Sequence, residues 1–493
     1  MSEVFNKNWN RERVRAGMRW FGPQDDVTIQ HIRQTPGVTN VITALHHIPA
    51  GEIWTVDEVA RRKVEVEFIP DPVAPDDVSG VELVNWYEQH GQRTGLVWDI
   101  AESLVFTEDV KNGSPHREKH IANYKQSLMN LGRLGVNKVV GNFMLVADWT
   151  RTSLTSLDDG STSLQYVHAA FAAFDIYLLK RHETVADYIA DGSFSEEEVE
   201  EARVYWEKYL RHDPQRQQEL INMITAGLPG AQEGFSLDDF RLAVAKYAGM
   251  SGDDLRDHIA YFLDEVVPVA VAAGVRLCCH ADDPAFTPFL GTPRTVGGAE
   301  GYKFLLDHGC GVNLCIGSLM ANEKNRDITT VVHEIVEYGR LKGMSAEDIF
   351  PHIHLRPIET DGKNFREGHH AEHREELAKV VHALVTIGWQ GVFRPDHAPA
   401  PDHGFGRPGY DAIGRGYGAQ VILGLFEMAE ILKATRAPVI AAAIKAAQGN
   451  PKLKQAAIQA AVEEETRQIA KKISFIKIPF VFSDQGVCAV FDE

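Results

Sequence analysis

Four side chains able to bind a metal ion follow four consecutive predicted strands in the second half of the chain. The strand ends read CCHADDP, NLCIGS, HIHLRP and FRPDHA, and they contain His280, Cys315, His354 and Asp396. The gaps between these residues are 35, 39 and 42 positions, about one strand–helix unit each. In a closed barrel the carboxyl ends of parallel strands meet at one mouth. Two imidazoles, a thiolate and a carboxylate would then form a four-ligand site for a divalent cation.

Each of these residues also has a structural interpretation. Cys315 alone fits a small buried apolar residue, and His280 alone fits a hydrogen-bonded histidine of the core. Asp396, which precedes His397, fits a cap or a loop residue. The shared spacing favours the metal site, but it leaves these alternatives open.

Two other motifs suggest different chemistry. His352-Ile353-His354 is an H-x-H pair at a strand end, as in metal-dependent hydrolases, where the pair is expected early in the barrel rather than late. Gly404–Gly409 matches G-x-G-x-x-G, but the dinucleotide fingerprint requires a strand before it and a helix after it. Pro408 lies inside the motif and further glycines follow it, so the pattern favours a mobile glycine-rich loop at the active site.

The elements that must position these residues are eight short apolar runs, each followed by a segment with apolar residues at helical spacing. This alternation predicts βα units and a parallel sheet, and eight units predict an α/β fold of the closed (β/α)₈ TIM-barrel type. A doubly wound sheet is the alternative, which periodicity alone does not separate. The predicted strands are Met18–Phe21, Val41–His46, Leu96–Ala101, Lys138–Phe143, Val275–His280, Val312–Gly317, His352–Arg356 and Gly391–Arg394.

The spacing of the strands predicts three parts of the chain. An N-terminal segment, 1–17, precedes a catalytic barrel over 18–430. More than a hundred residues separate Phe143 from Val275, and we expect a mostly helical insertion at about 152–240. Ser195 followed by Glu198 predicts a capping box there, and Ser236 with Asp239 predicts a second helix start. A separate small domain is the alternative for this insertion.

The residues after the barrel, 431–493, are expected to form a helix-plus-hairpin extension. Ala429–Lys472 has the composition of two helices that are broken near Gly449-Asn450-Pro451. Ile473–Phe482, which reads ISFIKIPFVF, has the composition of a strand and starts a hairpin. A hairpin this apolar either packs on the barrel or pairs with another subunit. We therefore expect a homo-oligomer, a dimer or larger.

Composition excludes several classes of partner. The chain has 493 residues, with 50 Lys and Arg against 69 Asp and Glu, so its formal charge is −19. This charge disfavours nucleic acid and anionic membranes, whereas a bound metal or a local arginine still permits a small anionic substrate. The 5 cysteines are scattered and odd in number, and no apolar signal segment is seen at the N-terminus. We expect a cytoplasmic protein without a membrane span.

Taken together, the residues resemble the mannonate dehydratase family, whose barrel is of the xylose-isomerase-like type. The matching stretches follow the family's order from about residue 18 to 430, and the set is specific although no single stretch is. They are RWFGPQD (Arg19–Asp25), ALHHIPAGEIW (Ala44–Trp54), NYKQSLMNL (Asn123–Leu131), NFMLVADWTRT (Asn142–Thr152), CHADDP (Cys279–Pro284), LCIGS (Leu314–Ser318), HLR (His354–Arg356), RPDH (Arg394–His397) and PGYDAIGR (Pro408–Arg415).

The resemblance implies that D-mannonate, a sugar acid, loses water to give 2-dehydro-3-deoxy-D-gluconate, with Mn²⁺ or Fe²⁺ bound. It places the metal ligands on the four strand-end residues and the acid/base pair on His397 and Tyr410. Loss of the weakly acidic C2 proton gives an enediolate, which a divalent cation stabilises, and the C3 hydroxyl must be protonated as it leaves. The sequence does not say which of the pair is the acid. A cysteine ligand also suits Zn²⁺, so Mn²⁺ rests on the resemblance.

Substrate contacts are expected from residues near the same strand ends. Arg356 and Arg394 suit the substrate carboxylate, with pairing to a barrel carboxylate as their structural alternative. The residues expected at the sugar hydroxyls are His46, Asn142, Asp148, Arg151 and His370.

Three departures from the family pattern lie beside the ligands. Ala281 replaces a usual Pro, and Pro357 and Ala398 replace small polar residues. Metal-dependent catalysis is therefore a firmer expectation than the substrate. The alternatives are dehydration of a different aldonate, a sugar isomerase or epimerase, a noncatalytic sugar-acid or metal-binding protein, and a hydrolase built on His352 and His354.

Overall fold

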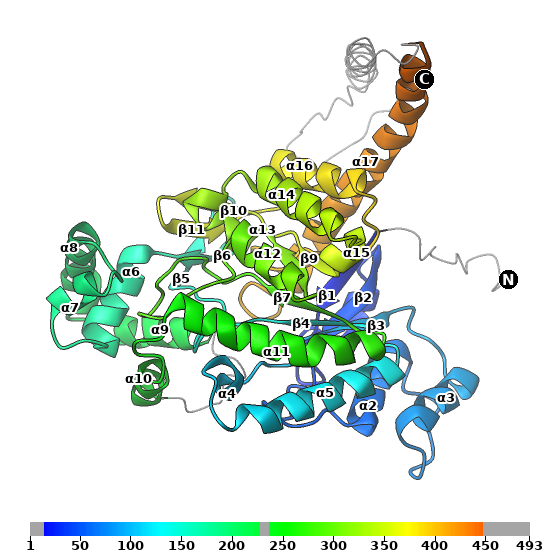
Figure 1. Cartoon of the computed structure of the whole chain (residues 1–493), viewed down its shortest axis with the longest axis horizontal. Coiled ribbons are helices and arrows are strands. Elements are labelled where there is room, and N and C mark those ends of the chain that lie inside the picture. The colour runs from blue at the N-terminus through cyan, green and yellow to red at the C-terminus, as the bar shows by residue number, and fades with distance from the viewer. Residues whose placement is uncertain (1–13, 227–235, 447–493) are drawn as a thin grey trace. The chain divides into compact units, whose positions relative to one another are not determined.

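A closed barrel of eight parallel strands forms the centre of the molecule (Figure 1). This computed structural model describes residues 14–226 and 236–446. Around the barrel the strands follow the order β1-β12-β9-β8-β7-β4-β3-β2. Their bounds are β1 Arg15–Arg19, β2 Val38–Thr43, β3 Val97–Glu102, β4 Lys138–Gly141, β7 Arg276–His280, β8 Gly311–Cys315, β9 His352–His354 and β12 Val392–Arg394.

All eight predicted strands are present in the predicted order, which confirms the TIM barrel and excludes the doubly wound sheet. The strands are short apolar runs because both of their faces are buried. One cluster of the hydrophobic core is formed by five side chains from five barrel strands, each at most 1% exposed. They are Ile42, Ile100, Val140, Cys278 and Val392.

Helices cover the outside of the barrel (Figure 1). Their inward faces are apolar, as in α14, where Val332 and Ile335 are fully buried. The helices of the barrel part are α1 Ile29–Arg33, α2 Val56–Glu67, α3 Gly80–His90, α4 Glu108–Lys111, α5 Arg117–Arg133, α11 Gly252–Ala272, α12 Ala299–Asp307, α13 Ile316–Met320, the short 3₁₀ helix η3 Glu323–Asn325, α14 Ile328–Leu341, α15 Ala346–Ile349 and α16 Arg374–Thr386.

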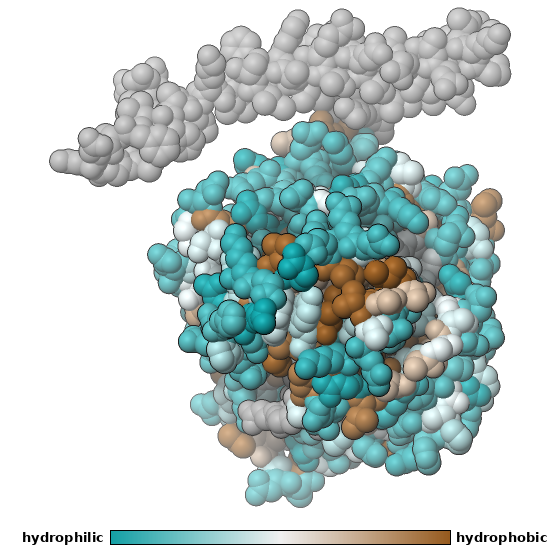
Figure 2. Space-filling view, turned by 90° about the vertical axis from the view of Figure 1, so that its left-hand side faces the viewer, coloured by the Kyte–Doolittle hydropathy of each residue, from teal (hydrophilic) through white to brown (hydrophobic). Residues whose placement is uncertain are grey.

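The insertion between β4 and β7 is helical after a β-hairpin at its start. The predicted capping box at Ser195 is present before α8, and the helix start predicted at Ser236 is the N-cap of α10, where it also forms a capping box. The helices are α6 His168–Ala173, the π-helix η1 Phe174–Leu179, α7 Val185–Ala190, α8 Glu196–Tyr205, the π-helix η2 Trp206–Leu210, α9 Pro214–Thr225 and α10 Leu237–Ala245. Figure 2 shows apolar side chains gathered among polar ones on the face that lies on the left of Figure 1.

The hairpin belongs to a second, antiparallel sheet that the sequence did not reveal. Its strands are β5 Ser153–Ser156, β6 Thr162–Tyr166, β10 Ile358–Asp361 and β11 Asn364–Glu367, in the order β10-β11-β6-β5. Phe365 of β11 pairs with Tyr166 of β6, so the insertion is joined to the loop after β9.

The boundaries of the three parts differ in detail from the expected ones. β1 begins at Arg15, inside the predicted N-terminal segment. The chain divides into compact units at 1–426 and 427–493, and helix α17, Ala412–Ala446, begins before the predicted extension. The predicted hairpin at Ile473–Phe482 and the break near Gly449 lie outside the described residues. In the described ranges, no helix has the length and apolar character needed to cross a membrane.

Candidate active site

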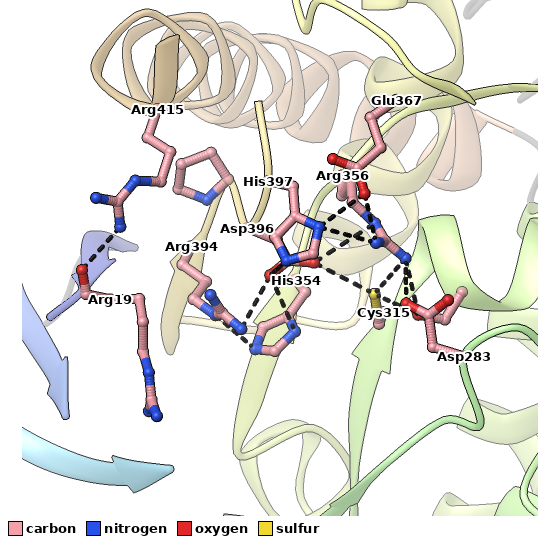
Figure 3. A network of polar contacts seen from close by, with 12 residues as sticks. Arg19, Asp283, Cys315, His354, Arg356, Glu367, Arg394, Asp396, His397 and Arg415 are labelled. Atoms are coloured by element: carbon pink, nitrogen blue, oxygen red, sulfur yellow. Dashed lines mark hydrogen bonds and ion pairs between the residues drawn. The ribbon is translucent and has the colours of Figure 1, made fainter. Parts of the chain in front are cut away.

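The strand ends bring the predicted metal ligands to one mouth of the barrel (Figure 3). His280, Cys315 and His354 are the last residues of β7, β8 and β9, and Asp396 follows β12. The register aligns Cys315 with His354 on neighbouring strands, and His354 with Arg394. Residues in such a row point their side chains the same way. The regular barrel spacing in the sequence therefore becomes a cluster in space.

The ligand atoms are close enough to share one cation. His280, Cys315 and His354 each offer an atom within 4.8 Å of the others. His280 Nδ1 lies 2.6 Å from the Ala281 carbonyl and donates a hydrogen to it, so Nε2 is the nitrogen that can bind a cation once it gives up its own proton. Nε2 faces His354 Nδ1 at 3.2 Å. Asp396 places Oδ2 3.8 Å from Cys315 Sγ and Oδ1 3.9 Å from His354 Nδ1. This set of two nitrogens, one sulfur and one carboxylate fits a divalent cation.

The electrostatics of the four residues also suit a cation. Burial lowers the pKa of His280, but Cys315 and Asp396 outweigh it and raise that pKa to about 9. Positive charge is therefore stabilised at this position. Burial and Arg394 lower the pKa of His354, which stays neutral and keeps a lone pair. Burial raises the pKa of Asp396, yet Arg394 and His397 outweigh it, so the carboxylate is ionised.

Asp396 holds its carboxylate through an unusual backbone conformation. Its φ is 66°, in the left-handed region that non-glycine residues rarely adopt. Aspartate tolerates this region better than most residues, and such conformations are found at functional sites. The turn directly after β12 aims Asp396 toward Cys315 and His354 and places His397 beside it.

Arg151 and Arg356 lie in a buried ion-pair network rather than open to a substrate. Arg356 bonds Asp283 at 2.8 Å and Glu367 at 3.0 Å. Arg151 bonds Asp283 at 2.9 Å and Glu367 at 3.0 Å, and both guanidinium groups are fully buried. Burial raises the pKa of Asp283, but Arg151 and Arg356 outweigh it and hold that pKa well below its usual range. The geometry therefore favours the structural interpretation of Arg356, in which it pairs with buried carboxylates rather than with the substrate. Arg151 pairs with the same two carboxylates.

His397 is oriented by Glu367, a residue the sequence did not single out. Its Nδ1 lies 2.7 Å from Glu367 Oε1, so Nδ1–H donates to the carboxylate and Nε2 is left to exchange a proton. The ring packs edge-on against Trp149 at 5.4 Å and Tyr410 at 4.7 Å. Burial raises the pKa of Glu367, whereas His397 and Arg151 outweigh it, so Glu367 stays ionised.

Tyr410 lies next to His397 and keeps its proton at neutral pH. Burial is the main cause that raises its pKa to about 12. Its ring also packs edge-on against Phe21 at 4.9 Å. The backbone of Tyr410 bridges to Ala398, which ties the glycine-rich loop to the segment after β12. The glycine motif leads into α17 but does not follow β12 directly, because β12 ends at Arg394 and the motif begins only at Gly404, so it does not match the dinucleotide fingerprint.

Among the other predicted substrate residues, Arg394 is buried and paired, whereas His46, Asn142 and Asp148 are at least partly exposed. Arg394 binds His354, Glu102 and Asp396, while its buried Nη1 has no hydrogen-bond partner among the described residues. His46 is exposed, with Nε2 3.3 Å from Arg19 Nη2. Asn142 and Asp148 are partly exposed, and burial raises the pKa of Asp148.

His370 is not among the residues that the fold brings to the metal ligands. Its Nε2 lies 2.9 Å from the Leu355 carbonyl and 3.0 Å from the Pro395 carbonyl. Burial lowers its pKa to about 4, so the ring is neutral. In this position it joins the segments that follow β9 and β12.

Some of the residues that sequence reasoning missed carried a signal. Glu102 ends β3, so the strand-end rule would have found it. Asp283 lies inside the CHADDP motif, three positions after a predicted ligand. Glu367 had no such signal, because it ends a short hairpin strand that is polar and lies outside the barrel.

Comparisons with known proteins agree on one family. The family model described as D-mannonate dehydratase (UxuA) matches residues 14–70 and 69–436. The mannonate dehydratase of Chromohalobacter salexigens is 38% identical over 416 residues, which cover 80% of this chain and 94% of the relative. That of a Marinomonas species is 34% identical over 426 residues, which cover 83% and 97%. The crystal structure of mannonate dehydratase from Streptococcus suis serotype 2 aligns with a TM-score of 0.60 and 26% identity, covering 86% of this chain and 95% of that chain.

Proposed function

The chain belongs to the D-mannonate dehydratase family and is a hydro-lyase, and from that premise we propose that it dehydrates D-mannonate at a divalent cation held by four strand-end residues. The single observation that supports this mechanism most is the approach of His280, Cys315 and His354 at the carboxyl end of the barrel, with one ligand atom of each within 4.8 Å of the others. Asp396 completes the set.

We assign Mn²⁺ to this site, with Fe²⁺ as the alternative. The carboxylate and imidazoles suit Mn²⁺, while the Cys315 thiolate extends the choice to softer ions. When bound there, the cation supplies positive charge that offsets the negative charge developing on the substrate as C2 loses its proton.

His397 and Tyr410 divide the proton transfers in this proposal. Glu367 holds the Nδ1–H of His397, so the free Nε2 takes the C2 proton, and the carboxylate stabilises the imidazolium that results. Tyr410 is protonated at neutral pH, because its pKa is about 12, and it donates its hydroxyl proton to the departing C3 hydroxyl. The two rings are 4.7 Å apart, which places both groups at one substrate.

The substrate carboxylate is assigned to Arg394. Arg151, Arg356 and Arg394 all pair with carboxylates. Arg356 Nε, which makes no hydrogen bond within the described ranges, lies 3.5 Å from Asp396. Arg394 keeps a terminal nitrogen, Nη1, buried without a hydrogen-bond partner among the described residues. Asn142, Asp148 and His46 are assigned to the sugar hydroxyls, because they are at least partly exposed. His370 is left out of this set, since its Nε2 bonds two backbone carbonyls.

One assay tests the proposal. The purified protein is stripped of metal and supplied with a panel of hexonates, with and without added Mn²⁺, and formation of 2-keto-3-deoxy acid is followed. We expect D-mannonate to be dehydrated only when metal is present. Turnover of another aldonate alone would mean that the substrate is not D-mannonate. The three departures from the family pattern, Ala281, Pro357 and Ala398, would then be the first residues to test. Conversion that conserves mass would indicate an isomerase or epimerase, and dehydration that survives stripping would overturn the metal dependence.

Two further assignments belong to the proposal. A cytoplasmic location is supported by the four cysteines of the described ranges, which are all free thiols. Cys279 and Cys310 remain unbonded although their sulfurs are 3.6 Å apart, as expected in a reducing compartment. A homo-oligomer, a dimer or larger, is supported by the apolar sequence of the tail, and light scattering before and after removal of residues 473–493 tests it.

A further inference from the structure

A second group of polar atoms lies on the other side of His354 from the proposed cation. Glu102, His352 and His354 each offer one atom within 4.8 Å of the others. Glu102 ends β3 and His352 begins β9. His352 Nδ1 lies 2.6 Å from the Val392 carbonyl and donates to it, which leaves Nε2 as an acceptor. That Nε2 and Glu102 Oε2 are buried without hydrogen-bond partners in the described part of the chain.

This group is not suited to a second metal ion, because Arg394 already lies within it. Arg394 Nη2 donates to Glu102 Oε1 at 2.9 Å, and Arg394 Nε donates to His354 Nε2 at 2.8 Å. A guanidinium at hydrogen-bond distance from two of the three ligands repels a further cation. The role of this group is therefore to be found in the hydrogen bonds that it makes with His354.

The hydrogen bonds of His354 are incompatible with a cation on its Nδ1. A neutral imidazole carries one N–H, and a nitrogen that binds metal must keep its lone pair. Binding through Nδ1 therefore puts the hydrogen on Nε2. The Nε–H of Arg394 would then face that N–H at 2.8 Å, so the present contact cannot persist. The carboxylate oxygen next in reach is Glu102 Oε1, 3.8 Å from Nε2.

We propose that Glu102 is a positioning residue of the metal site: it accepts the Nε2–H of His354 when Nδ1 binds the cation, and Arg394 moves its Nε–H away. This inference rests on the metal dependence proposed above. A carboxylate that accepts from the outer nitrogen of a metal-binding histidine fixes the ring and makes it a better ligand. Glu102 has the capacity to do so, because its Oε2 and Arg394 Nη1 both lack a hydrogen-bond partner among the described residues and can exchange partners. Oε2 also lies at the ion-pair distance of 3.7 Å from Arg19 Nη1.

Metal affinity tests the proposal independently of turnover. The metal-stripped protein is titrated with Mn²⁺ alone in competition with a chelating dye, and Glu102→Gln is compared with the unmodified chain. We expect binding about 10–100-fold weaker in Glu102→Gln, the effect typical of losing an outer partner of a ligand. The matched control is Glu67→Gln, because Glu67 is also a buried carboxylate paired with two cations, Lys63 at 2.6 Å and Arg93 at 3.2 Å. It ends α2, outside the barrel, and this variant should bind Mn²⁺ as the unmodified chain does.

A second variant separates Glu102 from Arg394. Arg394→Lys keeps the positive charge but removes the Nε donor that opposes the His354 hydrogen. We expect it to bind Mn²⁺ as tightly as the unmodified chain or more tightly. Weaker binding would contradict the proposal, because it would mean that Arg394 supports the ligands through His354 or Asp396 and does not have to move away. This variant decides the question if circular dichroism shows that Glu102→Gln does not fold.

The outcomes distinguish this inference from the function on which it rests. If the unmodified chain takes up no Mn²⁺, the metal dependence fails and this inference fails with it. If it binds Mn²⁺ and Glu102→Gln binds equally well, only the role of Glu102 fails. In a crystal structure with Mn²⁺ bound, the distance from His354 Nε2 to Glu102 Oε1 should shorten from 3.8 Å to a hydrogen bond. A distance that stays unchanged would overturn the proposal.

Discussion

Glu367 connects the proposed proton transfer to the buried arginines, and Glu367→Gln tests that connection. Its Oε1 accepts from His397 Nδ1 at 2.7 Å, from two nitrogens of Arg151 at 3.0 and 3.2 Å, and from Arg356 Nη1 at 3.0 Å. The side chain is 1% exposed, so water does not replace what is lost. The substitution keeps the shape of the side chain but removes the negative charge that these three groups share.

Two effects of known size follow from this change. Removing one partner of a buried ion pair costs about 3–5 kcal/mol, because the charges left behind are uncompensated. We expect the free energy of unfolding to fall by that order, since Asp283 is then the one carboxylate that pairs with both arginines in the described part of the chain, and only Arg356 has a second, Asp396, at 3.5 Å. The imidazolium of His397 also loses its counter-charge. We therefore expect kcat to fall by about 10²–10⁴-fold, the usual contribution of an oriented acid or base.

The assay measures kcat for D-mannonate at saturating Mn²⁺, together with urea unfolding. The matched control is Glu359→Gln on the neighbouring strand β10, where the carboxylate pairs with Arg366 at 2.7 Å and is about one-third exposed. That pair is worth at most about 1 kcal/mol, so both stability and kcat should be nearly unchanged. If Glu367→Gln turns over substrate as fast as the Glu359→Gln control, Glu367 does not orient His397 and the acid/base assignment must be revised.

Three further predictions concern other parts of the site. Tyr410→Phe keeps the ring packing, so we expect unchanged thermal stability and a kcat lower by about 10²–10⁴-fold; unchanged turnover would remove Tyr410 as the acid. Cys315→Ser replaces a soft ligand by a hard one, and a dye-competition titration should show weaker binding of Zn²⁺ and Fe²⁺, whereas equal affinity would exclude Cys315 from the ligands. Because Arg151 and Arg356 lower the pKa of Asp283, its ion pairs stabilise the fold above the usual carboxyl pKa of about 4, and this stability is lost as the pH falls below it. Asp283→Asn should therefore flatten the acid side of a stability–pH curve, and a curve of unchanged slope would refute the pairing.

The barrel and the four strand-end residues could be predicted from the sequence because both depend on local, periodic signals. Each strand is a short apolar run, and residues at its carboxyl end must meet at the barrel mouth, which is why His280 and Cys315 could be paired across 35 positions. The partners of arginines carry no such signal. Arg356 reads equally well as a substrate ligand or as an ion-pair partner, and only the approach of Asp283 and Glu367 separates the two.

The second sheet could not be predicted for a different reason. β5 and β11 have only four residues each, and mostly polar sequences, SLTS and NFRE, that resemble loops. What makes β11 a strand of this sheet is pairing between segments about two hundred residues apart, such as Gln165 with Arg366. Glu367 depends on that pairing, so its position opposite His397 could not be predicted either.

The second sheet also separates the residues of the proposed site by the element that carries them. All four proposed cation ligands lie at the ends of barrel strands, whereas Glu367 belongs to a hairpin added outside the barrel and braced by another within the insertion. The proposed cation ligands therefore depend on the barrel strands, whereas the carboxylate that orients His397 depends on the second sheet. A change in the hairpin that carries Glu367 would alter the partner of His397 and leave the four strand-end residues where the barrel places them.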